Sequence, residues 1–183
     1  MYKALFSHKE ISDVSEYYSF VSDLLRDSAV QKLAEFPHHK GTTRLQHSLN
    51  VSYYNYLFCR RLHLDRCSAA RAGLLHDLFL YDRHDGEPAE DEGGHCRLHP
   101  KVAFYNAAER FPLNDCESDM ILKHMWPMTP QLPKYRETWV IQLVDKLCAM
   151  GEVCAHAARF SRRKLRLAGA FSLMVLVKLT IHF

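Results

Sequence analysis

The chain reads Leu74-Leu75-His76-Asp77-Leu78-Phe79-Leu80-Tyr81 near its midpoint, and small residues (Ala69, Ala70, Ala72 and Gly73) precede this run. An adjacent histidine and aspartate are therefore surrounded by apolar side chains. Burying a charged carboxylate costs several kcal/mol unless it is paired or binds a metal. On these two residues alone, a capped helix end with a solvated aspartate explains the pair as well as a metal site does. The rest of the chain decides between the two.

Histidine is the unusual part of the composition, with 12 residues among 183. Imidazole is a common metal ligand and acid–base group, so this enrichment favours such chemistry. The hydrophobic content of 48% and the charged content of 25% are typical of a soluble globular protein. Seven glycines and seven prolines are few, which argues against an all-β or disordered chain. A single domain with a sizeable core is expected.

The six cysteines form no Cys-x-x-Cys pair, so neither a zinc ribbon nor a thioredoxin-type site is indicated. The first ten residues hold no apolar stretch long enough for a signal peptide. A cytoplasmic location with free thiols is therefore expected.

Two predicted helices place histidines on inward faces. The first runs from Thr42 or Thr43 to Leu62, and His47 lies beside its apolar stripe, in a row of helical spacing. The second is capped by Asp65 or Ser68 and ends near Tyr81. Its small residues allow close approach to a neighbouring helix, so His47 and His76 could meet.

The segments on either side complete a helical pattern. Apolar spacing predicts a covering helix over residues 10–35. The following loop contains His38-His39, which could add a ligand or touch substrate, although a solvated loop is the favoured interpretation. Residues 82–97 are predicted to form a mobile loop over one end of the bundle.

Three further helices are predicted after that loop. Pro100 suits the first turn of a helix that ends near Arg110, which places His99 at or near its N-cap. Asn114 and Glu117 have capping-box spacing and open a short helix ending near His124. The longest helix runs from Arg136 towards Phe160 and carries Asp145. Its predicted core stripe consists of Trp139, Val140, Leu143, Leu147 and Met150.

The spacing of the candidate ligands indicates one common centre. Each interval between successive candidates is about one helix plus one turn, so antiparallel helices would bring all of them together. The fold expected is an all-α, single-domain helical bundle with a metal site between the helices. The candidate ligands are His47, His76, Asp77, His99, His124 and Asp145.

The order and spacing of these residues resembles the HD-domain superfamily of metal-dependent phosphohydrolases. Arg44-Leu45-Gln46-His47-Ser48-Leu49 resembles the first histidine motif of that family, and Ala72-Gly73-Leu74-Leu75-His76-Asp77 resembles its namesake motif. Leu143-Val144-Asp145-Lys146 resembles its final aspartate motif. The resemblance covers roughly residues 36–155.

The resemblance implies that His47, His76, Asp77 and Asp145 hold one divalent metal ion. His99 and His124 match the subset of the family with a second ion, in which Asp77 bridges both. The chain departs from the family in two respects. The family often has a Gly-Lys pair two residues after the His-Asp motif, whereas this chain has Leu78-Phe79-Leu80-Tyr81 there. In addition, His95 competes with His99 for one ligand position.

The ligand types predict the chemistry. Mixed histidine and carboxylate sites suit Fe, Mn, Zn, Ni or Co better than Ca, and one or two such ions are expected. Paired ions can bind phosphate and activate a water, so that a metal-bound hydroxide attacks phosphorus, and Asp77 is the central catalytic residue in this interpretation. The candidates for binding phosphate are, in order of preference, Arg44, Lys146 and Arg136. Each is explained equally well as an ordinary surface cation. Tyr81 and Trp126 could stack on a base or simply pack in the core.

The domain limits follow from charge and pattern. Residues 1–158 carry a net charge of −3, whereas residues 159–183 hold six basic residues and no acidic one. The predicted parts are a covering helix over 1–35, the metal-binding domain over 36–158 and a basic, apolar tail over 159–183. The tail is expected to continue the bundle or to pack in a homodimer. Its association with an anionic membrane is the less favoured alternative.

Hydrolysis of a small phosphate substrate, in particular a nucleotide, is the function that the resemblance implies. Two alternatives stay open: oxygen chemistry at a di-iron centre on the same helices, and a nucleotide-binding module without turnover. The intact set of ligands argues against the module. No stable complex with nucleic acid is expected.

Overall fold

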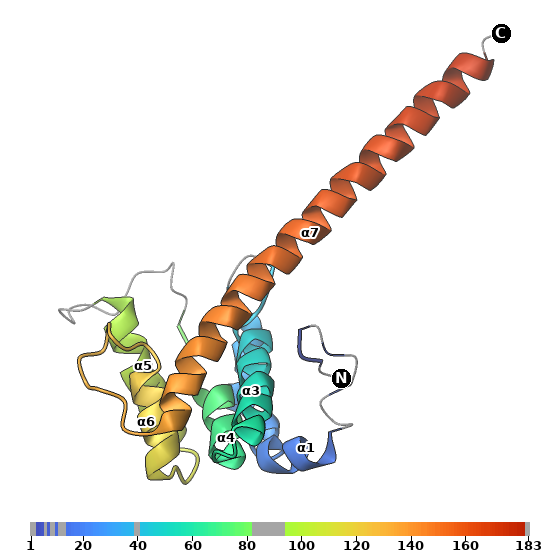
Figure 1. Ribbon diagram of the computed structural model, residues 1–183. Coiled ribbons are helices and arrows are strands. Elements are labelled where there is room, and N and C mark those ends of the chain that lie inside the picture. Colours follow the sequence, from blue (N-terminus) through green and yellow to red (C-terminus); the bar gives the residue numbers. More distant parts are fainter. Residues whose placement is uncertain are drawn as a thin grey trace.

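The computed structural model describes residues 3–5, 7, 10, 14–38, 41–81 and 94–181, with the backbone alone for residues 162–181. Every regular element in these ranges is helical, so the predicted all-α fold is confirmed. Helices α3 (Arg44–Arg61) and α4 (Arg66–Leu75) form the centre of the bundle. Helices α5 (His95–Ala108) and α6 (Asp115–Lys123) lie on one side, and α7 (Arg136–Ile181) crosses the centre and extends far beyond it (Figure 1).

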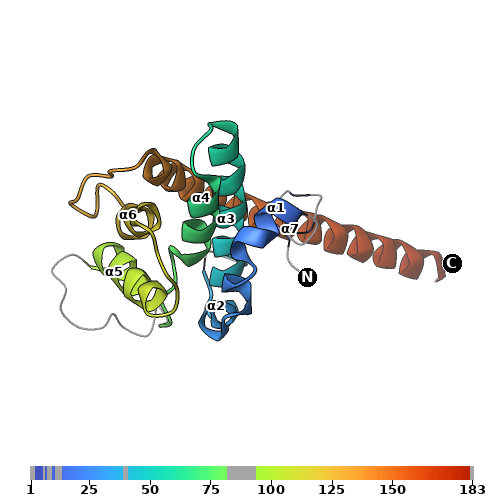
Figure 2. The same cartoon turned by 90° about the horizontal axis from the view of Figure 1, so that it is seen from below.

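The predicted single helix over residues 10–35 is wrong. The structure has four short helical segments in its place: α1 (Ser15–Val21), η2 (Leu24–Arg26), α2 (Ser28–Lys32) and η3 (Leu33–Glu35). Asp27 ends η2 in an extended conformation and caps α2, because its side chain accepts hydrogen bonds from Ala29 N and Val30 N. The apolar residues still reach the core, on the face of α3 and α4 opposite α5 and α6 (Figure 2).

Small residues bring α3 and α4 into close contact, as predicted. A Cβ atom placed on Gly73 would lie only 2.6 Å from the Cα atom of Ser52. Ser52 also donates a hydrogen bond to the carbonyl oxygen of Ala70 at 2.6 Å. Because the two backbones nearly touch, the start of α3 and the end of α4 are fixed relative to each other.

Helix α4 ends six residues before the predicted Tyr81, and the His-Asp pair lies in the turn that follows it. His76 is the C-cap residue, and Phe79 N donates to the carbonyl oxygen of Asp77 at 2.8 Å. The carbonyl groups after the pair are bound by side chains from other helices: Asn106 donates to Leu78 O, and Arg44 donates to Phe79 O and Tyr81 O. These bonds replace the helical ones and stop the helix.

Helix α5 begins at His95, earlier than predicted. His99 is therefore inside the helix and is not its N-cap, and Pro100 occupies the sixth position. Proline has no amide hydrogen, so the helix lacks the bond that this residue would otherwise donate to the carbonyl group of Cys96. The predicted loop over 82–97 is thus helical from His95 onward, and residues 82–93 lie outside the described ranges.

The capping box of α6 is confirmed, since Glu117 N donates to Asn114 and Asn114 N donates to Glu117. The predicted core stripe of α7 is wrong for four of its five residues, because only Val140 packs against the core. Trp139, Leu143, Leu147 and Met150 are 42–58% exposed. The side of α7 that faces the bundle carries Thr138, Ile141, Gln142, Val144, Cys148 and Glu152.

None of the helices in the described part of the chain has an apolar stretch long enough to cross a membrane. The side chains of residues 162–183, on which the interpretation of the tail depends, lie outside the description.

Candidate metal centre

Four of the predicted ligands meet where α3, the end of α4 and α7 come together. His47 lies in the first turn of α3, and its Nε2 atom is 3.0 Å from Asp145 Oδ1 on α7. His76 Nε2 is 3.7 Å from Asp77 Oδ2 and 3.8 Å from Asp145 Oδ1. These residues from three helices thus form one compact group at the end of the bundle where α3 starts and α4 ends.

The other two predicted ligands lie on the opposite side of Asp77. His99 of α5 has its Nε2 atom 3.5 Å from Asp77 Oδ1, and the same oxygen is 3.8 Å from Nε2 of His124, which follows α6. One oxygen of Asp77 therefore faces His76 and the other faces His99 and His124. A carboxylate in this position can bridge two cations.

The histidines present unprotonated nitrogens to this centre. The Nδ1 atoms of His76, His99 and His124 lie 2.7–2.9 Å from the carbonyl oxygens of Gly73, His95 and Ile121. Each Nδ1 must therefore carry a proton, which leaves Nε2 with a lone pair when the ring is neutral. Backbone groups thus fix these three imidazoles in the orientation that a metal requires.

His47 is oriented by a carboxylate that the sequence analysis did not identify. Its Nδ1 atom donates to Glu152, whose two oxygens lie 3.1 and 3.2 Å away. Asn50 donates to the same carboxylate at 2.7 Å, and Glu152 is only 1% exposed. The signal in the sequence is its position: Glu152 follows Asp145 by seven residues, two turns along the same face of α7.

The electrostatics keep Asp77 and Asp145 charged and favour the neutral form of His99 and His124. Burial raises the pKa of Asp77, but the surrounding histidines, His76 first, outweigh this effect and hold the pKa well below its usual range. Burial also lowers the pKa of His124 to about 3, with help from His76 and His99. For His47, burial lowers the pKa, but the hydrogen bonds that the ring donates to Asp145 and Glu152 outweigh this effect and raise the pKa to about 10.

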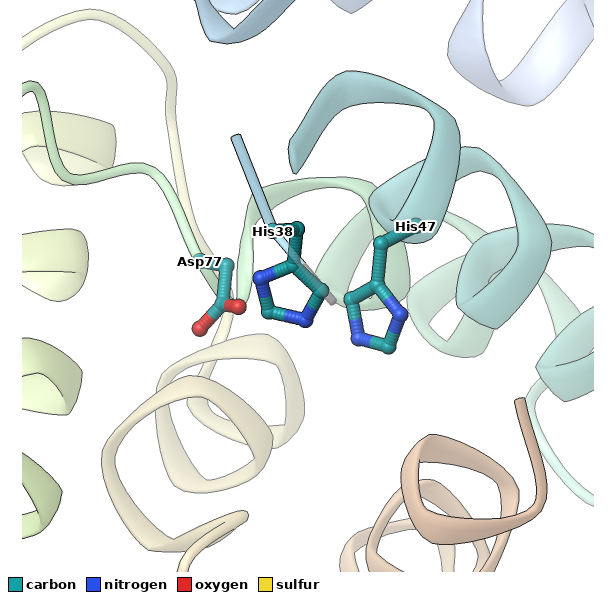
Figure 3. Close-up of side chains that lie close together, drawn as sticks. All are labelled: His38, His47 and Asp77. Atoms are coloured by element: carbon teal, nitrogen blue, oxygen red, sulfur yellow. The ribbon is translucent and has the colours of Figure 1, made fainter. Parts of the chain in front are cut away.

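His38 lies beside this centre, although the sequence analysis favoured a solvated loop there. Its ring centroid is 4.1 Å from that of His47, with 30° between the ring planes. Figure 3 shows the His38 ring between Asp77 and His47. The ring is half-buried, so the solvated-loop interpretation is wrong for His38, and His39 lies outside the described residues.

A cavity of about 480 Å³ opens onto the centre. Its lining includes four of the predicted metal ligands: Asp77, His99, His124 and Asp145. The apolar part of its wall is formed by Pro37, Phe79 and Met125. Lys146 lies at its exposed edge. Its size is within the range of small-molecule sites. An apolar hollow of about 250 Å³ between α3 and α7 contains no charged side chain and does not suit phosphate.

The four predicted substrate residues have different positions. Arg44 lines the cavity but is 1% exposed, and its guanidinium group stacks 3.6 Å from the Phe79 ring while it holds the turn after the His-Asp pair. Lys146 lines the cavity. Arg136 is exposed at the start of α7, away from the cavity wall. Tyr81 also lies outside that wall, and its hydroxyl group is 3.5 Å from His95 Nδ1.

Distances show which of His95 and His99 lies nearer to the other predicted ligands. His99 Nε2 lies 3.0 Å from His124 Nε2, whereas the His95 ring stacks on His99 at 4.6 Å. His99 is therefore the closer of the two to Asp77 and His124. Trp126 packs edge-on against Trp139 and does not line the cavity.

The residues present fit a bound metal. His76 Nε2 is buried and has no hydrogen-bond partner among the described residues, which is costly for a polar atom. His99 and His124 point two acceptor nitrogens at each other at 3.0 Å, with both Nδ1 protons already donated to carbonyl groups. A bound cation would pair with His76 Nε2 and would remove the repulsion between the facing nitrogens of His99 and His124. Three groups of donor atoms lie close enough to hold one: His38, His47 and Asp77; His47, His76 and Asp145; and His76, Asp77 and His124.

In a comparison with protein families, residues 44–150 match the HD domain. The chain matches no individual curated protein and no solved structure. The matched segment begins at Arg44 and includes the six predicted ligands. Because it covers more than half of the chain, this protein belongs to the HD-domain family, whose members are generally metal-dependent hydrolases.

Proposed function

We propose that this protein is a metal-dependent phosphohydrolase that cleaves a phosphate ester or anhydride of a small molecule, in particular a nucleotide. The observation that carries the proposal is the position of Asp77. Its two oxygens face two sets of unprotonated histidine nitrogens at the base of a cavity large enough for a nucleotide-sized ligand.

In this proposal His47, His76, Asp77 and Asp145 hold one divalent ion, and Asp77, His99 and His124 hold a second. Divalent ions in such a site lower the pKa of water and offset negative charge on phosphate oxygens. The donor set suits Fe, Mn, Co, Ni or Zn.

The chain itself supplies binding and orientation. Backbone carbonyl groups hold three histidine rings in place, so little reorganisation is needed when substrate binds. Lys146, exposed at the cavity edge, is positioned to bind a phosphate that extends towards solvent. Arg44 adds positive charge to the wall while it holds the backbone of Phe79 and Tyr81. Phe79 and Met125 provide apolar surface for a nucleoside.

The test is elemental analysis of the purified protein, followed by a phosphate-release screen over nucleotides, dinucleotides and sugar phosphates. Replacing Asp77 with Ala should abolish metal binding and hydrolysis, because it removes the carboxylate shared by both sets of ligands. Asp115→Ala, an exposed aspartate in the first turn of α6, is the control and should retain both.

Two results would contradict the proposal. One is hydrolysis at the wild-type rate by Asp77→Ala protein loaded with Mn or Fe. The other is reductant-dependent oxygen uptake without phosphate release, which would indicate di-iron oxygen chemistry. Tight nucleotide binding with no turnover by the metal-loaded protein would identify a binding module.

A further inference from the structure

The backbone before α3 fixes the position of His38. Arg44 N donates to Phe36 O at 2.9 Å, and Pro37 and Thr43 form an isolated antiparallel bridge. His38 N then donates to Thr42 O at 3.0 Å. The residue is therefore attached to the first turn of α3, the same turn that carries His47.

The side chain of His38 lines the cavity close to the predicted ligands His47 and Asp77. One nitrogen of His38, one nitrogen of His47 and one oxygen of Asp77 all lie within 4.8 Å of one another. Two ligands on opposite sides of an ion, each about 2.0–2.2 Å from it, are about 4.0–4.4 Å apart. Small side-chain movements would therefore bring all three atoms onto one ion.

Position alone does not require His38 to be a ligand, because a histidine could simply cover His47. Two observations favour ligation. The ring lies between Asp77 and His47 rather than on the outside of either (Figure 3), and it lines the cavity that opens onto them. His38 precedes the HD-domain match, which begins at residue 44, so its role is not implied by the family match.

We propose that His38 is a fifth protein ligand of the ion held by His47, His76, Asp77 and Asp145. The inference rests on the metal centre of the proposed function. Five donors leave one position of a six-coordinate ion for water or a phosphate oxygen. Such a site suits Mn, Fe, Co or Ni better than zinc, which prefers four ligands.

The experiment compares three full-length proteins: wild type, His38→Ala and His63→Asn. His63 is an exposed histidine beyond the opposite end of α3, and its φ of 55° is one that asparagine adopts readily. Each protein is titrated with Co²⁺, and its affinity is measured by competition with a chelator. NMR spectra of histidine-labelled protein at one equivalent of Co²⁺ then count the imidazole rings that carry the large contact shifts of direct ligands.

His38→Ala should bind Co²⁺ about tenfold more weakly or worse, and its spectrum should show one directly ligated histidine fewer than wild type. His63→Asn should match wild type in both measurements. An unchanged number of ligated histidines in His38→Ala overturns the inference, even if the affinity falls, because the ring would then act only by packing. Failure of the wild-type protein to bind Co²⁺, Mn²⁺ or Fe²⁺ would instead overturn the proposed function. Circular dichroism of the variants checks that the helices are intact.

Discussion

His47 lies between two carboxylates that have different roles. Asp145 lies beside the Nε2 atom, which is directed at the metal centre. Glu152 accepts a hydrogen bond from Nδ1 on the opposite side of the ring. A carboxylate in the second position fixes the tautomer of the ring and makes it a stronger ligand. Glu152 is therefore a positioning residue for His47 and does not itself reach the cavity wall.

Replacing Glu152 with Gln should weaken metal binding by about 10–100-fold, because the neutral amide holds the imidazole less firmly and lowers its basicity. The measurement is chelator competition with Mn²⁺ or Co²⁺. Glu117→Gln is the matched control, since Glu117 is also buried but pairs with Arg71 at 3.0 Å. That variant should lose stability and keep its metal affinity. Equal affinities for Glu152→Gln and wild type would contradict the role assigned to Glu152.

At the residue scale, spacing alone identified six residues that the structure brings together. Their intervals reflect the length of one helix plus one turn, which is a property that sequence displays directly. Glu152 was missed because it is a single acid on a helix whose exposed face is more apolar than its buried one. The position of His38 cannot be predicted from periodicity, because it depends on the backbone contacts of His38 with Thr42 and of Pro37 with Thr43.

At the scale of elements, the contact between α3 and α4 sets the distance between their histidines. The ring centroids of His47 and His76 are 5.5 Å apart, and each residue lies within about one turn of where its helix begins or ends. Gly73 allows this distance, since a Cβ atom there would be 2.6 Å from Ser52 Cα and 2.9 Å from Ser52 N. Both neighbours are backbone atoms, so neither can rotate away.

Gly73→Ala should therefore destabilise the protein in spite of the better helix propensity of alanine. Overpacking costs about 1–3 kcal/mol, whereas the gain in propensity is at most about 1 kcal/mol, so a net loss of roughly 1 kcal/mol is expected. Urea unfolding of the metal-free protein measures this loss. Metal affinity should fall as well, because separating the helices moves His76 away from His47. A variant that is more stable than wild type would show that the helices can separate without cost.

The elements also show where sequence patterns were insufficient. The stripe of Trp139, Leu143, Leu147 and Met150 has helical spacing, but α7 carries apolar residues on two faces, and spacing cannot tell which one meets the bundle. The sequence predicts a later end for α4 because residues 76–81 contain no glycine or proline. Its actual end depends on Arg44 and Asn106, which bind the carbonyl groups of Phe79, Tyr81 and Leu78 from other helices.

At the scale of the whole molecule, the centre joins helices from most of the chain. Its side chains come from the start of α3, the end of α4, the interior of α5, the end of α6 and the first three turns of α7. Without a cation, the buried nitrogen of His76 is unpaired within the described residues, and His99 and His124 face each other through acceptor atoms. The folded state therefore has more to gain from metal than an unfolded chain, in which residues 47–145 are spread apart.

This difference predicts a linkage between metal concentration and folding. At a free Mn²⁺ concentration of 100 times its dissociation constant, the free energy of unfolding should rise by about 2.7 kcal/mol for one site that is absent in the unfolded chain. Binding at both proposed sites would raise it further, whereas metal binding to histidines of the unfolded chain would reduce the gain. Urea unfolding with Mn²⁺ and with excess chelator measures the effect. Asp77→Ala should show the same stability under both conditions, because its centre lacks the shared carboxylate. A wild-type protein whose stability does not respond to Mn²⁺, Fe²⁺ or Co²⁺ would mean that these converging side chains are packed without holding a metal.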